Sequence, residues 1–203
     1  HNARANPDIN QAKGVSVRFG IHGLELVVGE SERTRAITHK IIPVPRISDM
    51  YCLGQIAKFE LSEIDDTIEN RRKIFEIMLG DSIKETCLDY VRELTEANFD
   101  SIKQEFSGKT LQVSQAMTWQ NNQISYSSQL AQFPKLSELV NLKLEQIKLE
   151  QANLVNIVPN NNLIPEQNSK DELKAAILEL LLDAMYYMTP KIVDKKETGY
   201  VAV

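Results

Sequence analysis

Every second position is apolar from Val15 to Phe19, at the start of the stretch GVSVRFGIHGLELVVGE. The alternation resumes at Leu24 after His22 and Gly23, and glycine tolerates the positive φ of a tight turn. Alternating apolar and polar residues are typical of a strand with one buried face. This stretch therefore predicts a β-hairpin whose turn lies at His22 and Gly23.

Prolines end the next apolar run, AITHKIIPVP, which predicts a third strand over residues 36–45. Apolar residues then recur every three or four positions from Ser62 to Gly80, and acidic residues fill the first turn, where the helix dipole favours them. This spacing predicts a helix. A second helical stretch is expected from Ser82, with a break near Asn98.

The segment TLQVSQAMTWQNNQISYSSQLA, residues 110–131, returns to a β pattern. Asn121 and Asn122 lie between two runs rich in serine, threonine and aromatic residues, which predicts the turn of another hairpin. A helix rich in leucine, glutamate and lysine is expected over residues 137–153, followed by a loop.

A capping box predicts the start of the last helix. Ser169 and Glu172 have the spacing at which each side chain satisfies a backbone N–H near the other, and the helix should end before Pro190. The expected fold class is α+β, predominantly helical with short antiparallel β-hairpins. It forms a single domain over residues 1–188, in which the polar residues 1–12 are expected to be a mobile arm.

The chain ends on an apolar tail, GYVAV, after the charged spacer KIVDKKETG. Leaving large apolar side chains exposed costs about 1.5–3 kcal/mol each, so a docking partner is expected. Residues 189–203 are interpreted as an arm that docks on a neighbouring subunit or on its own domain, and the two arrangements stay open. The expected anchors of this arm are Ile192, Val193, Tyr200, Val201 and Val203.

Composition is that of an ordinary globular domain, with 42% hydrophobic and 25% charged residues. There is neither a signal peptide nor an apolar run close to the roughly 18 residues of a membrane span, so no membrane partner is expected. Cys52 and Cys87 lack a CxxC or histidine-rich context, which favours reduced core cysteines. The net charge of −5 is uneven, because residues 1–46 hold seven Lys or Arg and four Asp or Glu. A nucleic-acid contact is therefore expected only locally.

Two basic groups are candidates for contact with RNA phosphates. The first spans residues 33–46 beside and within the predicted third strand, where arginine and lysine could follow a phosphate backbone. The second spans residues 71–73 of a helix, where nearby glutamates offer ion pairs and a solvated helix face is the more ordinary explanation. The candidate RNA-binding residues are Arg33, Arg35, Lys40, Arg46, Arg71, Arg72 and Lys73.

Nothing in the sequence forms a complete catalytic or metal-binding motif. The stretch FSGKT ends like a phosphate-binding loop, but the required glycine is replaced by Lys103 and the order runs from helix to strand. Gly108 is better explained as a helix C-cap, followed by a solvated Lys109. No catalytic residue, metal ligand or cofactor is assigned from the residues themselves.

The stretches GVSVRFGIHGLELVVGESER and ISDMYCLGQIAKFEL, together with the ending ETGYVAV, resemble the viroplasm matrix protein of fijiviruses, which are plant reoviruses. The resemblance covers most of the chain and rests on the general character of these stretches rather than on a diagnostic motif. It implies a non-structural protein of the host cytoplasm that builds viral inclusion bodies. It also implies dimers that assemble into a ring-like octamer through an exchanged C-terminal arm, and binding of single-stranded RNA.

The resemblance further allows ATP as a ligand and weak ATP hydrolysis, although no residue here matches a nucleotide site. The sequence-based hypothesis is therefore a self-assembling scaffold that binds single-stranded RNA through clustered arginine and lysine. Two alternatives stay open: an RNA-associated nucleotide hydrolase, and a cytosolic protein-interaction domain without a nucleic-acid role.

Overall fold

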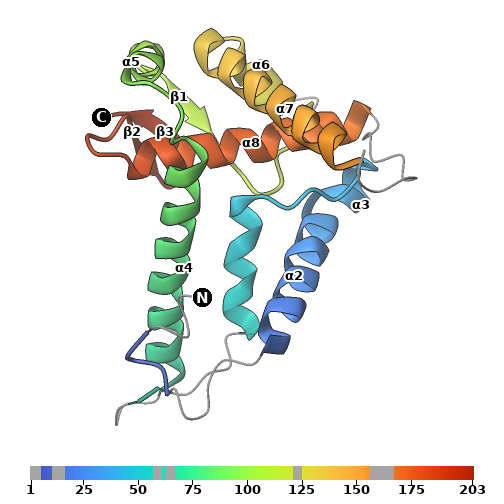
Figure 1. The fold of residues 1–203 in the computed structure, drawn as a ribbon, viewed down its shortest axis with the longest axis vertical. Coiled ribbons are helices and arrows are strands. Elements are labelled where there is room, and N and C mark those ends of the chain that lie inside the picture. The colour runs from blue at the N-terminus through green and yellow to red at the C-terminus, as the bar shows by residue number, and fades with distance from the viewer. Residues whose placement is uncertain (1–5, 11–16, 57–60, 63–66, 121–124, 156–166) are drawn as a thin grey trace.

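The computed structural model describes residues 6–10, 17–56, 61–62, 67–120, 125–155 and 167–203. Helices dominate, and three short strands form one antiparallel sheet in the order β1-β3-β2 (Figure 1). The predicted fold class, α+β and predominantly helical, is thus confirmed. The elements are α2 (Val17–Ser31), η1 (Glu32–Ala36), α3 (Ile37–His39), η2 (Ile47–Ile56), α4 (Ile68–Tyr90), α5 (Glu96–Glu105), β1 (Thr110–Gln112), α6 (Tyr126–Leu130), α7 (Pro134–Val155), α8 (Gln167–Tyr187), β2 (Val193–Lys196) and β3 (Gly199–Ala202).

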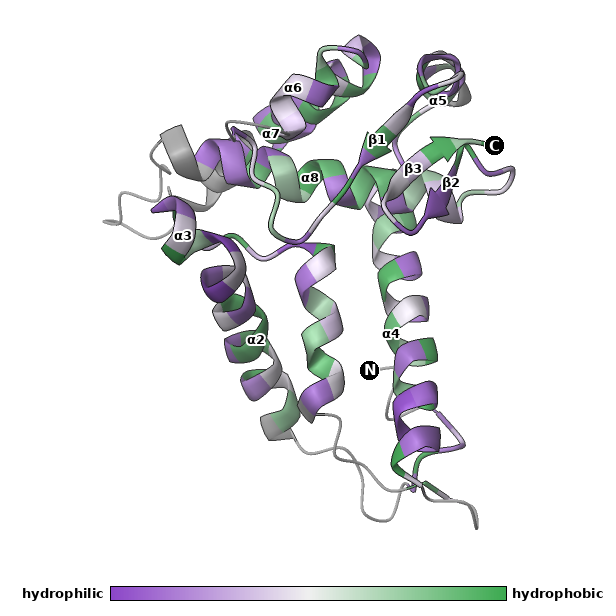
Figure 2. Ribbon diagram, turned by 180° about the vertical axis from the view of Figure 1, so that it is seen from behind, coloured by the Kyte–Doolittle hydropathy of each residue, from purple (hydrophilic) through white to green (hydrophobic). Residues whose placement is uncertain are grey.

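Helix α8 is the centre of the main body. Its hydrophobic middle runs between α7 and α4 (Figure 2), and Leu178, Leu181, Leu182 and Met185 have no exposed surface. A helix that is apolar on most of its circumference must be covered on most sides. The sheet, α4 and α7 supply that cover.

A second part of the molecule is a layer of three helices that extends from the body. Helix α2 packs on the 3₁₀ helix η2, and η2 packs on α4, so the three lie side by side (Figure 1). Val27 of α2 and Phe75 of α4 are buried in this layer. Exposed apolar side chains, such as Leu24 and Ile77, remain on its surface.

The β-hairpin predicted over residues 15–28 is wrong, because Val17–Ser31 forms helix α2. Gly23, Val27 and Ser31 recur every fourth position and are buried, which is the helical spacing that the alternation obscured. β-branched residues favour strands only weakly, and packing of this face against η2 outweighs that preference.

The strand predicted over residues 36–45 is also wrong: Ile37–His39 ends a helix, and Lys40 adopts a left-handed conformation that terminates it. The two helices expected on either side of Gly80 form one helix, α4, which starts at Ile68 after the N-cap Thr67. A single glycine inside a helix is tolerated at a cost of about 1 kcal/mol.

Of the hairpin predicted over residues 110–131, only the short strand β1 forms at its start. Helix α6 lies where the second strand was expected. The turn at Asn121 and Asn122 lies outside the described residues. Ser169 is already helical, as the third residue of α8, so it is not the N-cap that the predicted capping box requires, and that prediction is wrong. Glu172 instead faces a buried arginine, as described below.

Part of the expected mobile arm is docked. Ile9 forms an isolated bridge with Leu61, has no exposed surface, and joins the hydrophobic core. Asp8 accepts a backbone hydrogen bond from Ser62 at 2.9 Å. The buried Ile9 and this hydrogen bond hold the segment against Leu61 and Ser62, which precede α4. Residues 1–5, 11 and 12 of the predicted arm lie outside the described residues.

Candidate functional site

Arg35, predicted to contact RNA, is 1% exposed. Its guanidinium forms a bidentate pair with Asp49, at 2.8 and 2.6 Å. It also donates to the carbonyl oxygens of Gln115, at 2.8 Å, and Val44, at 3.0 Å. These bonds satisfy the fixed fork of donors that an arginine presents. Arg35 thus joins η1, η2 and the segment after β1.

Arg46, the second predicted RNA contact in this region, is 3% exposed and pairs with two glutamates of α8. It forms a short ion pair with Glu172, and its Nη1 lies 3.3 Å from Glu179. Burial acts to lower the pKa of the Arg46 guanidinium, but the charges of Glu179 and Glu172 raise it above its ordinary value. Arg46 therefore stays charged and ties the start of η2 to α8.

Tyr126 and Trp119 complete this buried network. The Tyr126 hydroxyl donates to Glu179 at 2.8 Å, and the Trp119 backbone N–H donates to Glu172 at 3.2 Å. The guanidinium of Arg46 lies 5.4 Å from the centre of the Tyr126 ring. Trp119 and Tyr126 are buried, so core packing explains these two aromatic residues.

Two candidate RNA residues thus have a structural role. Arg35 and Arg46 cannot reach a phosphate backbone in this fold, because their guanidinium groups are enclosed and paired. The acidic partners of these arginines were not predicted from the sequence, although their spacing along the chain could have indicated them. Glu172, Glu179 and Asp183 lie seven and four positions apart on α8, which places three carboxylates on one otherwise buried face. Buried carboxylates of this kind require cationic partners.

The other candidate RNA residues lie at the surface. Arg33 and Arg72 have side chains that are 71% and 76% exposed. Arg33 of η1 pairs with Glu30 of α2, and Arg72 pairs with Glu76 on α4. Lys40 and Lys73 are exposed, and Arg71 is half-buried. The fold does not gather them in one patch, because η1 and the start of α4 lie at opposite ends of the helical layer (Figure 1).

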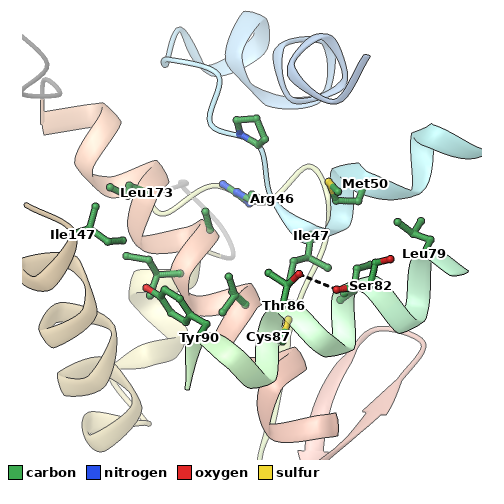
Figure 3. Close-up of a pocket in the computed structure, with 15 residues that line it drawn as sticks. Arg46, Ile47, Met50, Leu79, Ser82, Thr86, Cys87, Tyr90, Ile147 and Leu173 are labelled. Carbon is green, nitrogen blue, oxygen red and sulfur yellow. Dashed lines mark hydrogen bonds between the residues drawn. The ribbon is translucent and has the colours of Figure 1, made fainter. Parts of the chain in front are cut away.

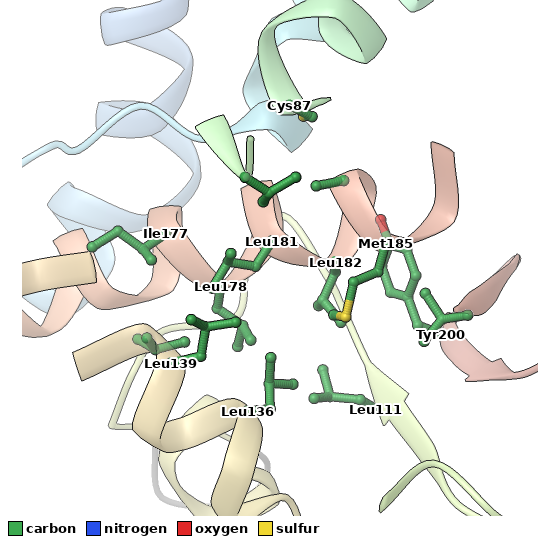
Figure 4. Close-up of a cluster of buried hydrophobic side chains, with 14 of the residues drawn as sticks. Cys87, Leu111, Leu136, Leu139, Ile177, Leu178, Leu181, Leu182, Met185 and Tyr200 are labelled. Carbon is green, nitrogen blue, oxygen red and sulfur yellow. The ribbon is translucent and has the colours of Figure 1, made fainter. Parts of the chain in front are cut away.

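The C-terminal tail forms the hairpin β2–β3, which packs on its own chain. Strand β3 lies between β2 and β1, with Tyr200 opposite Leu111. Val193 and Tyr200 are buried, and Figure 4 shows Tyr200 beside Met185 of α8. Of the two arrangements that the sequence left open, the structure has the tail docked on its own domain. Of the other expected anchors, Ile192 is buried, Val201 half-buried and Val203 exposed.

A buried carboxylate fixes the hairpin to α8. Asp183 accepts hydrogen bonds from the Tyr200 hydroxyl and from the Lys195 ammonium, both at 2.7 Å. Burial, followed by the charge of Asp183, raises the pKa of Tyr200 far above its ordinary value. Burial acts to lower the pKa of Lys195, but Asp183, through its charge and its hydrogen bond, together with Tyr51 and Glu179, raises that pKa above its ordinary value. The hairpin is thus held by a charge-assisted contact as well as by apolar packing.

Both edges of the sheet are blocked. The Gln129 side chain bonds the backbone N–H of Gln112 at 2.7 Å and its carbonyl oxygen at 3.1 Å, as a neighbouring strand would. On the opposite edge, β2 carries the exposed side chains of Lys195 and Lys196. Charged and covered edges disfavour pairing with a strand of another chain.

Two adjoining cavities lie beside α4. The first, of about 360 Å³, lies between α4, α8 and η2 and is almost wholly apolar (Figure 3). The second, of about 520 Å³, is lined by charged residues, among them Arg92 and Lys143. Tyr90 and Ile147 line both cavities, so the two meet at these side chains.

The glycine–lysine–threonine stretch has the conformation expected of a helix end. Gly108 follows α5 with a φ of +68°, and the Lys109 ammonium donates to the carbonyl oxygen of Gln132 at 2.9 Å. This arrangement does not form a cradle of backbone N–H groups for phosphate. In the described part of the chain, no three or more His, Cys, Asp or Glu residues are grouped as a metal site would need.

None of the described helices combines the length and the hydropathy that a membrane crossing requires. Comparison with family models, with curated proteins and with solved structures finds no match to this chain.

Proposed function

We propose that this chain is a self-assembling scaffold of the kind that the viroplasm matrix proteins of fijiviruses form, and that it exchanges its C-terminal hairpin between subunits. In this proposal it binds single-stranded RNA and acts in viral inclusion bodies of the host cytoplasm. One observation carries self-assembly: the hairpin supplies two of the three strands and buries Val193 and Tyr200 against α8. Every copy of the chain offers the same receptor for this hairpin.

The segment between α8 and β2 suits an exchange. Thr189, Pro190 and Lys191 are exposed and separate the end of α8 from the buried Ile192. If this segment extends away from the body, the hairpin can reach the receptor of a second copy and form the same contacts there. Domain swapping of this type needs no new interface chemistry, since each native contact is made once in either arrangement.

Exchange is favoured over assembly through the sheet edges. Gln129 is bonded to the backbone of β1 at Gln112, and the exposed lysines of β2 disfavour pairing with another strand. The exposed apolar side chains of the helical layer, such as Leu24 and Ile77, offer further contact area once subunits are brought together.

RNA binding is proposed for the exposed basic residues Arg33, Lys40, Arg71, Arg72 and Lys73. Surface ion pairs such as Arg72 with Glu76 contribute little, because both groups remain solvated. A phosphate can therefore replace the glutamate at a small cost. Several subunits in one assembly would repeat these charges and strengthen a field that one subunit produces only weakly.

Light scattering on the intact chain tests self-assembly. The proposal predicts a mass that is a multiple of the 23.0 kDa of one chain and that persists on dilution into the micromolar range. A mass of one chain at every concentration would contradict it. Truncation after Thr198 is a poor test, because it removes β3, the central strand of the sheet.

Fluorescence anisotropy with a labelled oligouridine tests RNA binding. Removing one cation that binds a phosphate should reduce the slope of log K against log salt by about 0.7, so Arg72→Gln/Lys73→Gln should flatten that slope and weaken binding at low salt. The matched control is Lys135→Gln/Lys148→Gln, which removes two cations as well, the exposed Lys135 and the half-buried Lys148, each paired with a glutamate. Equal affinity of both double variants would place the RNA surface elsewhere.

A further inference from the structure

Lys143 of α7 carries a buried charge without an acidic partner. Its side chain is 5% exposed, and its ammonium donates to the Tyr90 carbonyl oxygen at 3.1 Å. The same group lies 4.8 Å from the centre of the Tyr90 ring. No carboxylate of the described residues lies within ion-pair distance of it. An ammonium has three donors, and burying it unpaired is unfavourable.

This lysine lines the 520 Å³ cavity, and of the described charged residues that line it Lys143 alone is buried. Arg92 forms a short ion pair with Asp89, and Glu93 is exposed to solvent. The buried ammonium of Lys143 is therefore the group in this cavity that a bound anion would neutralise. A singly charged anion fits better than a doubly charged one, because Asp89 and Glu93 would repel excess negative charge.

The adjoining cavity is suited to a hydrocarbon. Leu79 and Ile83 of α4 face Leu173, Ile177 and Leu180 of α8 across a space of about 360 Å³, which lies in the size range of small-molecule sites. In Figure 3, Tyr90 and Ile147 lie at one end of this cavity and Met50 and Leu79 at the other. The apolar cavity therefore extends away from the charged one, starting at the two side chains that they share.

We propose that the two cavities form one site for a long-chain carboxylate. Its hydrocarbon chain lies between α4 and α8, and its carboxylate accepts hydrogen bonds from the ammonium of Lys143. A charge-assisted hydrogen bond of this kind replaces water on a group that is already desolvated. The site lies on the α7 side of α4, apart from the C-terminal hairpin, so it does not depend on subunit exchange.

Calorimetric titration with laurate, below its micelle concentration, tests this site against lauryl alcohol, which has the same chain without the charge. Laurate should bind about tenfold tighter than the alcohol. Lys143→Gln should remove that difference and leave the binding of the alcohol unchanged. Lys84→Gln, which removes an exposed lysine of α4 outside both cavities, is the matched control and should change neither affinity.

Filling the apolar cavity is the complementary test. Ala176 lines it and is half-buried, so Ala176→Leu should weaken laurate and lauryl alcohol alike, by about tenfold or more. Unchanged laurate binding by folded Lys143→Gln protein would overturn the proposal. So would sedimentation of the intact chain with anionic vesicles in the absence of any laurate binding, which would identify a membrane surface instead.

Discussion

Arg33 and Arg35 are two positions apart, and the fold gives them opposite environments. The Arg33 side chain is 71% exposed and pairs with Glu30, whereas Arg35 is enclosed and held by Asp49 and two carbonyl oxygens. Residues two apart on a helical segment point in widely different directions. The interpretation of residues 33–46 as one basic surface failed because it assumed a strand and a loop, where neighbouring cations can share a face.

Arg35→Ala should lower the free energy of unfolding by about 3–5 kcal/mol, because it leaves the buried carboxylate of Asp49 without its partner. Arg33→Ala removes an exposed cation and should leave stability close to that of the parent chain. Urea unfolding followed by circular dichroism measures both. Equal midpoints for the two variants would show that the Arg35 pair does not hold this part of the fold together.

Three of the six tyrosines should resist ionisation in the folded protein. Burial raises the pKa of Tyr187 to about 12, and burial also raises the pKa values of Tyr126 and Tyr200 far above 10. These residues stabilise the fold below pH 10, where the tyrosine side chains are neutral in both the folded and the unfolded protein. That contribution is lost as the pH rises above 10, because the unfolded chain then ionises and the folded one does not.

Absorbance at about 295 nm, which reports tyrosinate, measures this effect during an alkaline titration. The expected result is a partial step near pH 10, with the remainder appearing only when circular dichroism shows unfolding. A single step of all six tyrosines near pH 10, with the helical signal intact, would contradict the buried positions of Tyr126 and Tyr200.

At the scale of elements, the sequence is sufficient to predict a helix where the hydrophobic pattern is local and strong. Apolar periodicity predicts the long helices α7 and α8, and glycine's freedom at a positive φ predicts that a helix ends before Gly108, as α5 does. The tail was recognised as a segment that needs a hydrophobic partner, and its partner, formed by β1 and α8, became visible only in three dimensions.

Helix α2 could not be predicted because its sequence fits two periods. Alternation and β-branched residues indicate strands, but the residues that become buried are spaced four apart and meet η2, a segment that itself lacks a clear pattern. The prediction that Arg35 and Arg46 contact RNA failed for a similar reason. The burial of Arg46 depends on carboxylates more than one hundred residues away on α8, and no short-range rule relates them.

Gly199→Ala tests the fit between the hairpin and its receptor. A methyl group at position 199 would lie 2.2 Å from the Leu111 carbonyl oxygen, on the central strand of the sheet. The expected loss in the free energy of unfolding is about 1–3 kcal/mol or more. Gly29→Ala in α2 is the control: nothing lies within 4 Å of its added methyl group, and alanine favours helices, so stability should stay equal or rise slightly. Similar midpoints for both variants would contradict this docking.

On the scale of the whole molecule, the C-terminal hairpin is joined to the body twice. Apolar packing fixes Tyr200 beside Met185, and Asp183 fixes both Tyr200 and Lys195. The segment before it, residues 189–191, is exposed. A strongly held hairpin on a short exposed connection satisfies the same contacts within one chain or between two, and the self-assembly proposal rests on the second arrangement.

A pair of cysteines placed across β1 and β3 distinguishes these arrangements. Thr110 and Val201 are directly opposite each other in the antiparallel ladder, where the Cα separation of about 4.5–5.5 Å permits a disulfide. Asp194 and Val201 are opposite each other within the hairpin itself, so Asp194→Cys/Val201→Cys is the matched control and should link each chain to itself in any arrangement. Burial raises the pKa of the Cys87 thiol to about 12 and also raises that of Cys52, so neither native thiol should interfere at pH 8.

The most direct measurement is therefore the mass of oxidised Thr110→Cys/Val201→Cys protein on a denaturing gel without reductant. Exchange of the hairpin predicts covalently linked dimers or larger species that revert to single chains on reduction, while the control remains monomeric. Closed single chains in both variants, from a sample that light scattering shows to be assembled, would contradict exchange of the hairpin as the basis of assembly.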